Sequence, residues 1–385
     1  MPTSEATLRA DIAALIELPS ISSFSPELDM SNQPVIAWLA SRFEDRGFSI
    51  VIQDVPGHPG KCNLIATLGR GEGGLILSGH TDTVPFDDGK WSSDPFSATE
   101  RDGCLHGLGT ADMKSFFALV LSACEGMTAA DLTSPLIIIA TADEETSMAG
   151  AKALAAAGGL GARHAIIGEP TDFRPVRLHK GILMERIRVE GRSGHSGDPG
   201  QGVNALEGMQ GVIHELLTWR SELQLAHRND AFPVPVTTLN LGRIAGGDSP
   251  NRICGACELD VDLRMLPGMT VPELRSTMRA RVQQALEGSQ LTGSFEVLFD
   301  GIDPLETPAG SDLVRAAEEL TGAESCGVVY GTEGPFLREL GMDVVILGPG
   351  SIDQAHQPDE YLRLDGLKSG VTVLREMIQK FCMRS

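Results

Sequence analysis

The chain has 385 residues and a net charge of −21, from 31 basic and 52 acidic side chains. Such a surplus of acids argues against a nucleic-acid partner, which usually requires a basic face. The hydrophobic share of 42% and the charged share of 22% are those of an ordinary soluble globular protein. A chain of this length exceeds what one hydrophobic core usually organises, so we expect two domains.

The N-terminus has the spacing of an amphipathic helix and lacks the basic and apolar regions of a signal peptide. Helical intervals separate Leu8, Ile12, Leu15 and Ile16, and Pro19 ends the pattern. No apolar stretch is long enough to span a membrane. The seven cysteines are scattered and odd in number, which is typical of a reduced protein and not of a disulfide scaffold. We therefore expect a cytoplasmic protein with no membrane partner.

Four short apolar runs end in polar residues and alternate with helical patterns that begin at Met113 and Met148. The runs are "GGLILSGHTD", "SPLIIIATADEE" (Ser134 to Glu145), "HAIIGEP" (His164 to Pro170) and "MDVVILGPGSIDQAH" (Met342 to His356). Strands that are apolar throughout and alternate with helices are typical of an α/β domain with a mostly parallel sheet. Sites in such sheets form beyond the carboxyl ends of the strands.

A literal GxGxxG occurs in "LGRGEGGL", at Gly69, Gly71 and Gly74. A phosphate-binding loop of this type opens a helix, whereas this segment joins two strand patterns. We interpret it as a hairpin turn, which excludes a dinucleotide enzyme.

The middle of the chain alternates like half-buried strands and predicts a different domain. Its patterns are a strand at 181–191, a helix at about 203–225, strands at 237–247 and 251–266, a helix after Pro272 and a strand from Ser294. This β-α-β-β-α-β order is ferredoxin-like. We predict an inserted domain at residues 180–300, within a catalytic domain made of residues 1–179 and 301–385. Cys254 and Cys257, three residues apart on a strand, would point to opposite faces and form neither a redox nor a zinc pair.

Polar side chains gather where the predicted parallel strands end. They are His80, Asp82, Asp112, Glu144, Glu145, Glu169 and His356. Each one alone is more often a solvated loop charge. Together, on one rim of one sheet, they provide the hard and borderline ligands of a metal site. The three carboxylates of Asp112, Glu145 and Glu169, with the imidazoles of His80 and His356, suit two divalent cations of a hydrolase.

The remaining two acids of this set have distinct expected roles. Glu144 is the neighbour of Glu145 on a turn, so one of them can bind metal while the other faces the attacking water. That makes Glu144 the general base, and then the acid that protonates the leaving amine. His80 and Asp82 are two residues apart and share a face on a strand, so we expect Asp82 to orient His80.

Several motifs resemble the co-catalytic zinc aminoacylase/carboxypeptidase family of metallohydrolases. They are "SGHTDTVP", "HGLGTADMKS", "TADEETSMAGA", "GEPT", "GRSGHSGDP" and "GPGSIDQAHQPDEYL". The resemblance covers nearly the whole chain. It implies two divalent ions, Zn²⁺ or alternatively Co²⁺, with His80 and Glu169 on one, Glu145 and His356 on the other, and Asp112 bridging them. It also implies a zinc-peptidase-like catalytic domain and a homodimer formed through the inserted domain.

Within that family the chain is most similar to the acetylornithine deacetylases, in "HKGILMERIRVEGRSGHS", "DSPNRICGACELDVDLRMLPGM" and "GTEGPFL". Gly197 and Gly334 depart from the residues more usual there, Ser and Ala. The implied reaction converts N-acetyl-L-ornithine to L-ornithine and acetate in arginine biosynthesis. The alternatives are N-acetylcitrulline deacetylase, succinyl-diaminopimelate desuccinylase and a broader N-acyl-amino-acid hydrolase. A relative that binds acyl amino acids without cleaving them would have lost a ligand or the base, and this sequence retains all of them.

The candidate substrate-binding residues lie in and beside the inserted domain. Arg252 can bind the substrate carboxylate bidentately, and we expect Lys180 and Asn251 to bind the substrate as well. The alternative for the two cationic residues is a salt bridge to nearby acids. His195 lies among turn residues in "RSGHSGDP" and can be a turn histidine. The resemblance implies instead that it reaches the partner's active site and stabilises an oxyanion there.

Overall fold

The structure is a computed structural model that describes residues 4–383, and the chain divides into two compact units. The first unit consists of Met1–Arg177, Thr307–Cys326 and Thr332–Ser385, and the second of Leu178–Glu306 and Gly327–Gly331. The second unit is therefore inserted between segments of the first. Within residues 4–383, no helix is both long enough and apolar enough to cross a membrane.

A mixed sheet contains most strands of the first unit. Its spatial order is β1 (Ser49–Asp54), β2 (Cys62–Leu68), β6 (Leu136–Thr141), β3 (Leu75–His80), β7 (His164–Ile167), β15 (Asp343–Ile346), β8 (Val176–His179) and β13 (Leu305–Glu306), with β14 (Cys326–Val328) beside β8. The central strands β6, β3, β7 and β15 pair in parallel. Every residue of β3, β6 and β7 is buried, which explains their continuous apolar runs. The predicted α/β class with a mixed sheet flanked by helices is confirmed, but the sheet is parallel only at its centre, because β1, β2, β8 and β13 pair antiparallel with their neighbours.

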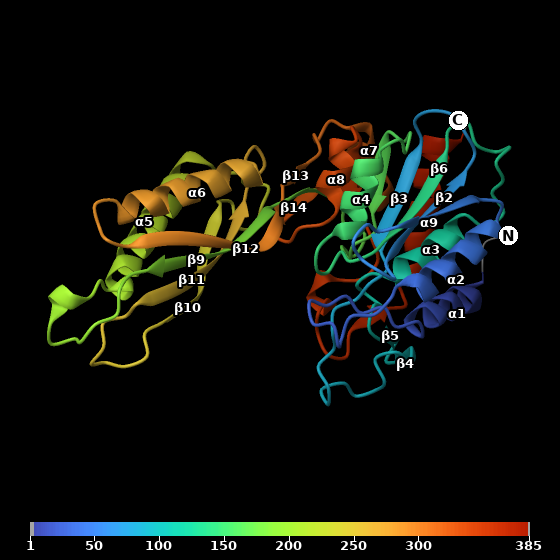
Figure 1. Cartoon of the computed structure of the whole chain (residues 1–385). Coiled ribbons are helices and arrows are strands. Elements are labelled where there is room, and N and C mark those ends of the chain that lie inside the picture. Colours follow the sequence, from blue (N-terminus) through green and yellow to red (C-terminus); the bar gives the residue numbers. More distant parts are fainter. Residues whose placement is uncertain (1–3, 384–385) are drawn as a thin grey trace. The chain divides into compact units, whose positions relative to one another are not determined.

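Helices cover both faces of this sheet. In Figure 1, α1 (Glu5–Ile16), α2 (Gln33–Glu44), α3 (Ser115–Ala123) and α9 (Leu367–Cys382) lie on one side of β2, β3 and β6, whereas α4 (Ala149–Ala157) and α8 (Gly334–Glu339) lie on the other. α7 (Asp312–Thr321) packs against α9. Helix α1 begins after Ser4, whose Oγ accepts a hydrogen bond from the backbone N–H of Thr7. Its predicted apolar face is buried in the main core.

The hairpin predicted for the GxGxxG segment is wrong. β2 and β3, which the segment joins, are not neighbours, because β6 from later in the chain lies between them. β6 is antiparallel to β2 and parallel to β3. Gly69, Gly71 and Gly74 all have positive φ, so the glycines serve the backbone path of this connection. The expectation that the segment opens no helix holds.

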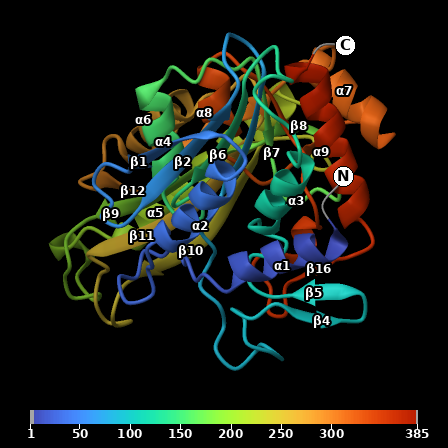
Figure 2. The same ribbon diagram turned by 90° about the vertical axis from the view of Figure 1, so that its right-hand side faces the viewer.

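A small antiparallel sheet joins two parts of the first unit that are far apart in sequence. It has the order β16 (Tyr361–Arg363), β5 (Cys104–His106) and β4 (Thr99–Arg101), and Figure 2 shows it beside α1. Tyr361 pairs with His106 in its register. The sheet therefore ties the segment that follows His356 to the segment that leads to Asp112.

The second unit contains a four-stranded antiparallel sheet with two helices. Its elements in chain order are β9 (Gly181–Glu190), the short 3₁₀ helix η1 (Pro199–Gln201), α5 (Ala205–Ala226), β10 (Thr238–Gly246), β11 (Ala256–Met265), α6 (Val271–Leu286) and β12 (Thr292–Ile302). The strand order is β10, β11, β9, β12, with antiparallel neighbours throughout. Figure 1 shows α5 and α6 together on one face of this sheet. Burial alternates strictly along β11, so one face of the sheet forms a core under the helices.

Cys254 and Cys257 are both free thiols, as expected. The reason given for this, that the two side chains point to opposite faces of a strand, is wrong. β11 begins at Ala256, later than the predicted start at residue 251, so Cys254 precedes the strand. Strand alternation does not apply there, and both side chains are buried in the core of the second unit. Neither belongs to a cluster of potential metal ligands among the described residues.

Candidate metal centre

His80 ends β3 at the carboxyl edge of the sheet and is almost completely buried. Its Nδ1 lies 3.0 Å from the backbone oxygen of Asp82, and its Nε2 lies 3.0 Å from Oδ1 of Asp112. A carbonyl oxygen can only accept, so Nδ1 carries the proton that it donates to Asp82. That hydrogen bond fixes the ring and leaves Nε2 to face the cluster as a potential metal ligand.

Asp82 contacts His80 through its backbone oxygen and the turn at Glu144 and Glu145 through its carboxylate. The second contact was not indicated by the sequence. The carboxylate oxygen nearest to His80 is 3.7 Å from Nδ1, so the orienting contact comes from the backbone carbonyl. The carboxylate instead accepts hydrogen bonds from the backbone N–H groups of Glu144 and Glu145, at 3.2 and 3.1 Å. The strand ends at His80, so the expected alternation does not extend to Asp82. Its side chain therefore fixes the turn that carries the two glutamates.

Asp112 lies between two histidines from distant parts of the chain. Its Oδ1 faces Nε2 of His80, and its Oδ2 is 3.5 Å from Nε2 of His356. His356 is also 3.0 Å from Oε2 of Glu145. His356 follows the short 3₁₀ helix η2 (Ile352–Gln354), and its side chain remains 53% exposed, whereas that of Asp112 is buried. The structure thus brings together ligands that the sequence placed at separate strand ends.

Two sets of potential ligand atoms share His80. One consists of His80, Glu144 and Glu169, the other of His80, Asp112 and Glu145, and within each set the atoms lie within 4.8 Å of one another. Glu169 is 3.6 Å from Nε2 of His80. The neighbours Glu144 and Glu145 therefore face different halves of the cluster, as side chains that diverge from one turn can.

The electrostatics of the cluster favour cations. Burial, reinforced by neighbouring acids, raises the pKa values of Glu144 and Glu169 well above the ordinary range, and that of Glu145 is also raised. Hydrogen bonds to Asp112 and Glu145 raise the pKa of His356 to about 10. Burial opposes ionisation of Asp112, but hydrogen bonds from His356 and His80 outweigh it and hold its pKa low.

The donor set therefore fits divalent metal ions. Imidazole nitrogens and carboxylate oxygens are the ligands that zinc takes in hydrolases. Without cations, the crowded acids hold protons or pair with protonated imidazoles at the same atoms that would bind metal. Metal ions would displace those protons and neutralise the acids together.

The predicted residues of the inserted domain lie in the second unit. His195 is exposed, and its Nδ1 accepts a hydrogen bond from the backbone N–H of Gly197 at 3.0 Å, so Nε2 carries the proton of the neutral ring. A Cβ atom at Gly197 would lie 3.1 Å from that ring, so the serine more usual in related enzymes would crowd His195. His195 also forms a β-bridge with Arg252.

Arg252 and Asn251 are solvent-exposed on the loop before β11. Arg252 has 54% of its side chain exposed and forms an ion pair with Asp248. The salt bridge to a nearby acid, which is the alternative to a role in substrate binding, is therefore present. Oδ1 of Asn251 accepts a hydrogen bond from Oγ of Ser249 at 2.6 Å. An exposed pair of this kind can be exchanged for a ligand carboxylate at little cost.

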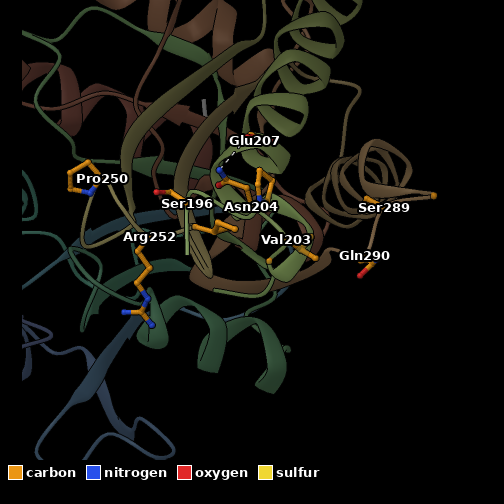
Figure 3. Close-up of a pocket in the computed structure, with 12 residues that line it drawn as sticks. Ser196, Val203, Asn204, Glu207, Pro250, Arg252, Ser289 and Gln290 are labelled. Carbon is orange, nitrogen blue, oxygen red and sulfur yellow. Dashed lines mark hydrogen bonds between the residues drawn. The ribbon is translucent and has the colours of Figure 1, made fainter. Parts of the chain in front are cut away.

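A surface cavity of about 570 Å³ lies beside this loop. Its polar lining includes Ser196, Asn204, Glu207, Arg252, Ser289 and Gln290. Figure 3 shows the Arg252 guanidinium on one side of the cavity and Ser289 with Gln290 on the other. Asn204 caps α5 and also donates a hydrogen bond to Glu207. The cavity lies within the second unit, where Ser196 from the His195 loop and Arg252 both line it.

Lys180 differs from Arg252, because only 1% of it is exposed. Its Nζ donates a hydrogen bond to the backbone oxygen of Val236 at 2.5 Å and lies 6.0 Å from the centre of the Phe232 ring. Burial, with a smaller contribution from Arg264, lowers the pKa of Lys180 to about 8.

This burial predicts a pH dependence of stability. The unfolded chain holds the Lys180 proton up to a pKa of about 10.4, above the folded value of about 8. Between these values the unfolded state binds more protons, so Lys180 makes the free energy of unfolding rise with pH in this window. We expect Lys180→Met to remove that rise, measured by urea unfolding at pH 7.5 and pH 10. Equal pH dependence in both proteins would show that the lysine is solvated.

Other residues of the first unit support the centre and were not singled out in the sequence. Lys61 is buried, and its Nζ lies 2.8 Å from both Asp29 and Asp143. Asp143 has a positive φ of 58° directly before Glu144, in the motif "TADEE". The sequence could have indicated a role for Asp143, because an acid at a turn beside two site glutamates can hold that turn. It could not have indicated the ion pair between Asp143 and Lys61, because the two residues are far apart in the chain.

Glu333 is the second such residue, in the motif "GTEGPFL". It is 2% exposed, and its Oε1 has no hydrogen-bond partner among the residues that the structure describes. Burial raises the pKa of Glu333 to about 7. Its charge contributes to the raised pKa values of Glu144 and Glu169, so it lies near the cluster.

A family model described as peptidase family M20/M25/M40 matches residues 76–380. The chain belongs to this family. The matched range contains every residue of the candidate metal centre and the whole of the second unit. The chain is therefore a hydrolase of a metallopeptidase family, as the motifs indicated.

Several solved structures of peptidases share the fold over almost the whole chain. A tripeptidase from Staphylococcus aureus has 19% identity, covers 99% of each chain and gives a TM-score of 0.76. The aminopeptidase PepT from Bacillus cereus has 20% identity, covers 98% of each chain and gives 0.75. A dinuclear metal-binding peptidase of the M20 family from Bacillus subtilis has 16% identity, covers 97% of each chain and gives 0.67. At these identities the likeness concerns the fold.

Proposed function

We propose that the chain is a metal-dependent amidohydrolase that removes the acetyl group from N-acetyl-L-ornithine, giving L-ornithine and acetate in arginine biosynthesis. The observation that carries the hydrolase proposal is the convergence of His80, Asp112, Glu145, Glu169 and His356, with Glu144 beside them, at the carboxyl edge of the sheet. The choice of substrate is supported by the motifs shared with acetylornithine deacetylases. Hydrolysis of acetylcitrulline, of succinyl-diaminopimelate or of other N-acyl amino acids is the alternative.

The residues would hold two divalent ions, and we propose zinc with cobalt as the alternative. His80 and Glu169 would hold one ion, Glu145 and His356 the other, and Asp112, which faces both histidines, would bridge them. When bound, such ions activate a water molecule and polarise the amide carbonyl.

Glu144 would move the proton. Its carboxyl group lies in the half of the cluster that contains His80 and Glu169, and Asp82 holds its backbone in place. The carboxylate takes a proton from the attacking water as the water oxygen bonds to the acetyl carbon. It then gives that proton to the amine nitrogen as the carbon–nitrogen bond breaks. The second proton of the water also passes to the amine nitrogen, so acetate and the ammonium form of ornithine result, and Glu144 returns to its starting charge.

Glu333 supports a substrate with a cationic side chain. A buried carboxyl group with one oxygen lacking a hydrogen-bond partner is costly, and an ammonium group would satisfy it. Ornithine carries such a group on its side chain, whereas citrulline carries a neutral ureido group. We therefore favour acetylornithine over acetylcitrulline.

Arg252 would bind the substrate carboxylate, and Asn251 and Lys180 would also contact the substrate. We expect Arg252→Ala to raise KM for acetylornithine by about tenfold or more, as loss of one charge-assisted hydrogen bond would. Its effect on the unfolding midpoint should be small, because the side chain is exposed and its ion pair with Asp248 lies at the surface. Steady-state kinetics with urea unfolding would measure both, and an unchanged KM would remove Arg252 from the site.

His195 would act across a homodimer formed through the second unit. Its Nε2 proton points away from the hydrogen bond at Nδ1, so the ring can donate to an oxyanion on the substrate. We expect His195→Ala to lower kcat by about 10²-fold or more with zinc content unchanged. Mixing His195→Ala with Glu144→Gln protomers should restore part of the activity, because one site of each mixed dimer would have both residues. Mixed dimers that stay inactive would place His195 outside the partner's site.

A substrate panel tests the proposed reaction. The zinc-loaded protein would be offered N-acetyl-L-ornithine, N-acetyl-L-citrulline, N-succinyl-diaminopimelate, N-acetyl-L-methionine and small peptides, with release of free amine as the measurement. We expect kcat/KM to be highest for acetylornithine. Glu333→Gln should reduce that preference over acetylcitrulline, and a protein that prefers peptides would contradict the proposed substrate while leaving the metal centre in place.

A further inference from the structure

Glu360 is a buried carboxylate that binds the backbone of the loop carrying Asp112. It is 1% exposed and directly precedes β16. Its Oε1 accepts hydrogen bonds from the N–H groups of Ala111 and Asp112, at 2.7 and 2.9 Å. Its Oε2 accepts a third from Gly109 at 3.0 Å. One side chain therefore satisfies three backbone donors of a single loop.

The loop is shaped to present these donors. Gly109 has a φ of +88°, and a Cβ there would lie 2.8 Å from Cδ of Lys114, so the chain turns tightly at this point. The backbone of Glu360 adds a further tie, because its carbonyl oxygen accepts from the N–H of Gly107 at 3.0 Å. A carboxylate suits this arrangement, since it only accepts, whereas a glutamine would direct its NH₂ group at one of the donors.

Glu360 also connects two ligands of the candidate metal centre. It is four residues after His356, and it holds the peptide N–H of Asp112 itself. The carboxylate of Asp112 faces His80 with one oxygen and His356 with the other. The place of Asp112 relative to His356 therefore depends on one buried side chain, which binds the backbone of the Asp112 loop and not the carboxylate of Asp112.

We propose that Glu360 is a positioning residue that sets Asp112 and His356 at the spacing needed to bind the second of two metal ions. The inference rests on the proposed metal centre. Partners that hold metal ligands in place typically contribute 10- to 100-fold to metal affinity. Loss of the Glu360 contacts should therefore weaken one metal equivalent much more than the other. The first ion would keep His80 and Glu169, which Glu360 does not hold, and share only Asp112 with the disturbed region, whereas the second would depend on both Asp112 and His356.

The test is zinc binding to the metal-free full chain, measured by calorimetry and by competition with a chromogenic chelator. Wild type should bind two equivalents. Glu360→Gln should bind the second about 10- to 100-fold more weakly, and the first with a clearly smaller loss of affinity. Glu318→Gln is the matched control, because Glu318 also accepts a backbone N–H, that of Ser325 at 2.9 Å, but should leave both affinities unchanged. Glu360→Asp keeps the charge with a shorter reach, and should also lose the second equivalent if Glu360→Gln does not fold.

The thermal midpoint of each metal-free variant separates positioning from folding. Two equivalents bound as in wild type by Glu360→Gln would overturn the proposal. Loss of both equivalents together with a collapsed thermal midpoint in both Glu360 variants would also overturn it, since the residue would then serve only the fold. A wild-type chain that binds no zinc would contradict the proposed function, and the inference with it.

Discussion

Glu144→Gln is expected to lower kcat by about 10²- to 10⁴-fold or more while zinc and substrate still bind. The amide has nearly the shape of the carboxyl group but cannot take a proton from water. Asp82 would still hold the turn, because it binds the backbone N–H groups of residues 144 and 145 and not their side chains. Zinc content and substrate affinity, measured beside single-turnover rates, would separate the lost proton transfer from lost binding.

Glu145→Gln is the matched control for this result. Glu145 is the adjacent residue, held by the same carboxylate of Asp82, but its side chain contacts His356. We expect the Glu145 variant to lose zinc and the Glu144 variant to retain it. Equal loss of zinc from both would mean that Glu144 is also a ligand, which its place beside His80 and Glu169 within 4.8 Å allows geometrically.

Removing the metal with a chelator is expected to abolish activity, and added zinc or cobalt should restore it. Burial, together with the charge of neighbouring acids, raises the pKa values of Glu144, Glu145 and Glu169, so ionising this cluster without cations is unfavourable. The metal-free chain should also unfold more easily, because a ligand that binds only the folded state stabilises it by about 2.7 kcal/mol at 100 times its Kd. Thermal unfolding with and without zinc measures this difference.

In the metal-removal experiment the second unit serves as the control for the first unit. That unit contains none of the clustered acids, so the direct effect of zinc should be confined to the first unit. Hydrogen exchange should show zinc-dependent protection around His80, Asp112 and the turn at residues 143–148. Full activity in a chelated protein shown by elemental analysis to contain no metal would refute the metal-dependent mechanism.

The parts of the site that could be predicted are those at the ends of buried parallel strands. Runs such as Leu75–Leu77 are apolar because both faces of the strand are covered, and the polar residue that follows must then lie at the edge of the sheet. His80, Glu169 and His356 were found by this reasoning, and the motifs then assigned each of them to one of the two expected ions. Local patterns also predicted the order of elements in the second unit.

The parts that escaped prediction depend on contacts between distant residues. The insertion of β6 between β2 and β3 cannot be seen in the segment that joins those strands, so a hairpin was expected there. The carboxylate of Asp82 binds the backbone of residues more than sixty positions later. Backbone donors carry no sequence signature, so neither this contact nor that of Glu360 with Asp112 could be derived from side-chain chemistry.

The insertion of the second unit has a consequence for synthesis on the ribosome. Strands β3, β6 and β7 leave the exit tunnel first, and the nearly continuous second unit follows before β15 and His356 appear. Until then, the edge of β7 that β15 covers in the finished protein has no partner strand. An open apolar edge of this kind invites pairing with other chains, so the nascent first unit is a candidate for chaperone protection. The same order makes His356 the last of the proposed metal ligands to be synthesised. Zinc therefore cannot complete and stabilise the native centre before nearly the whole chain has left the ribosome.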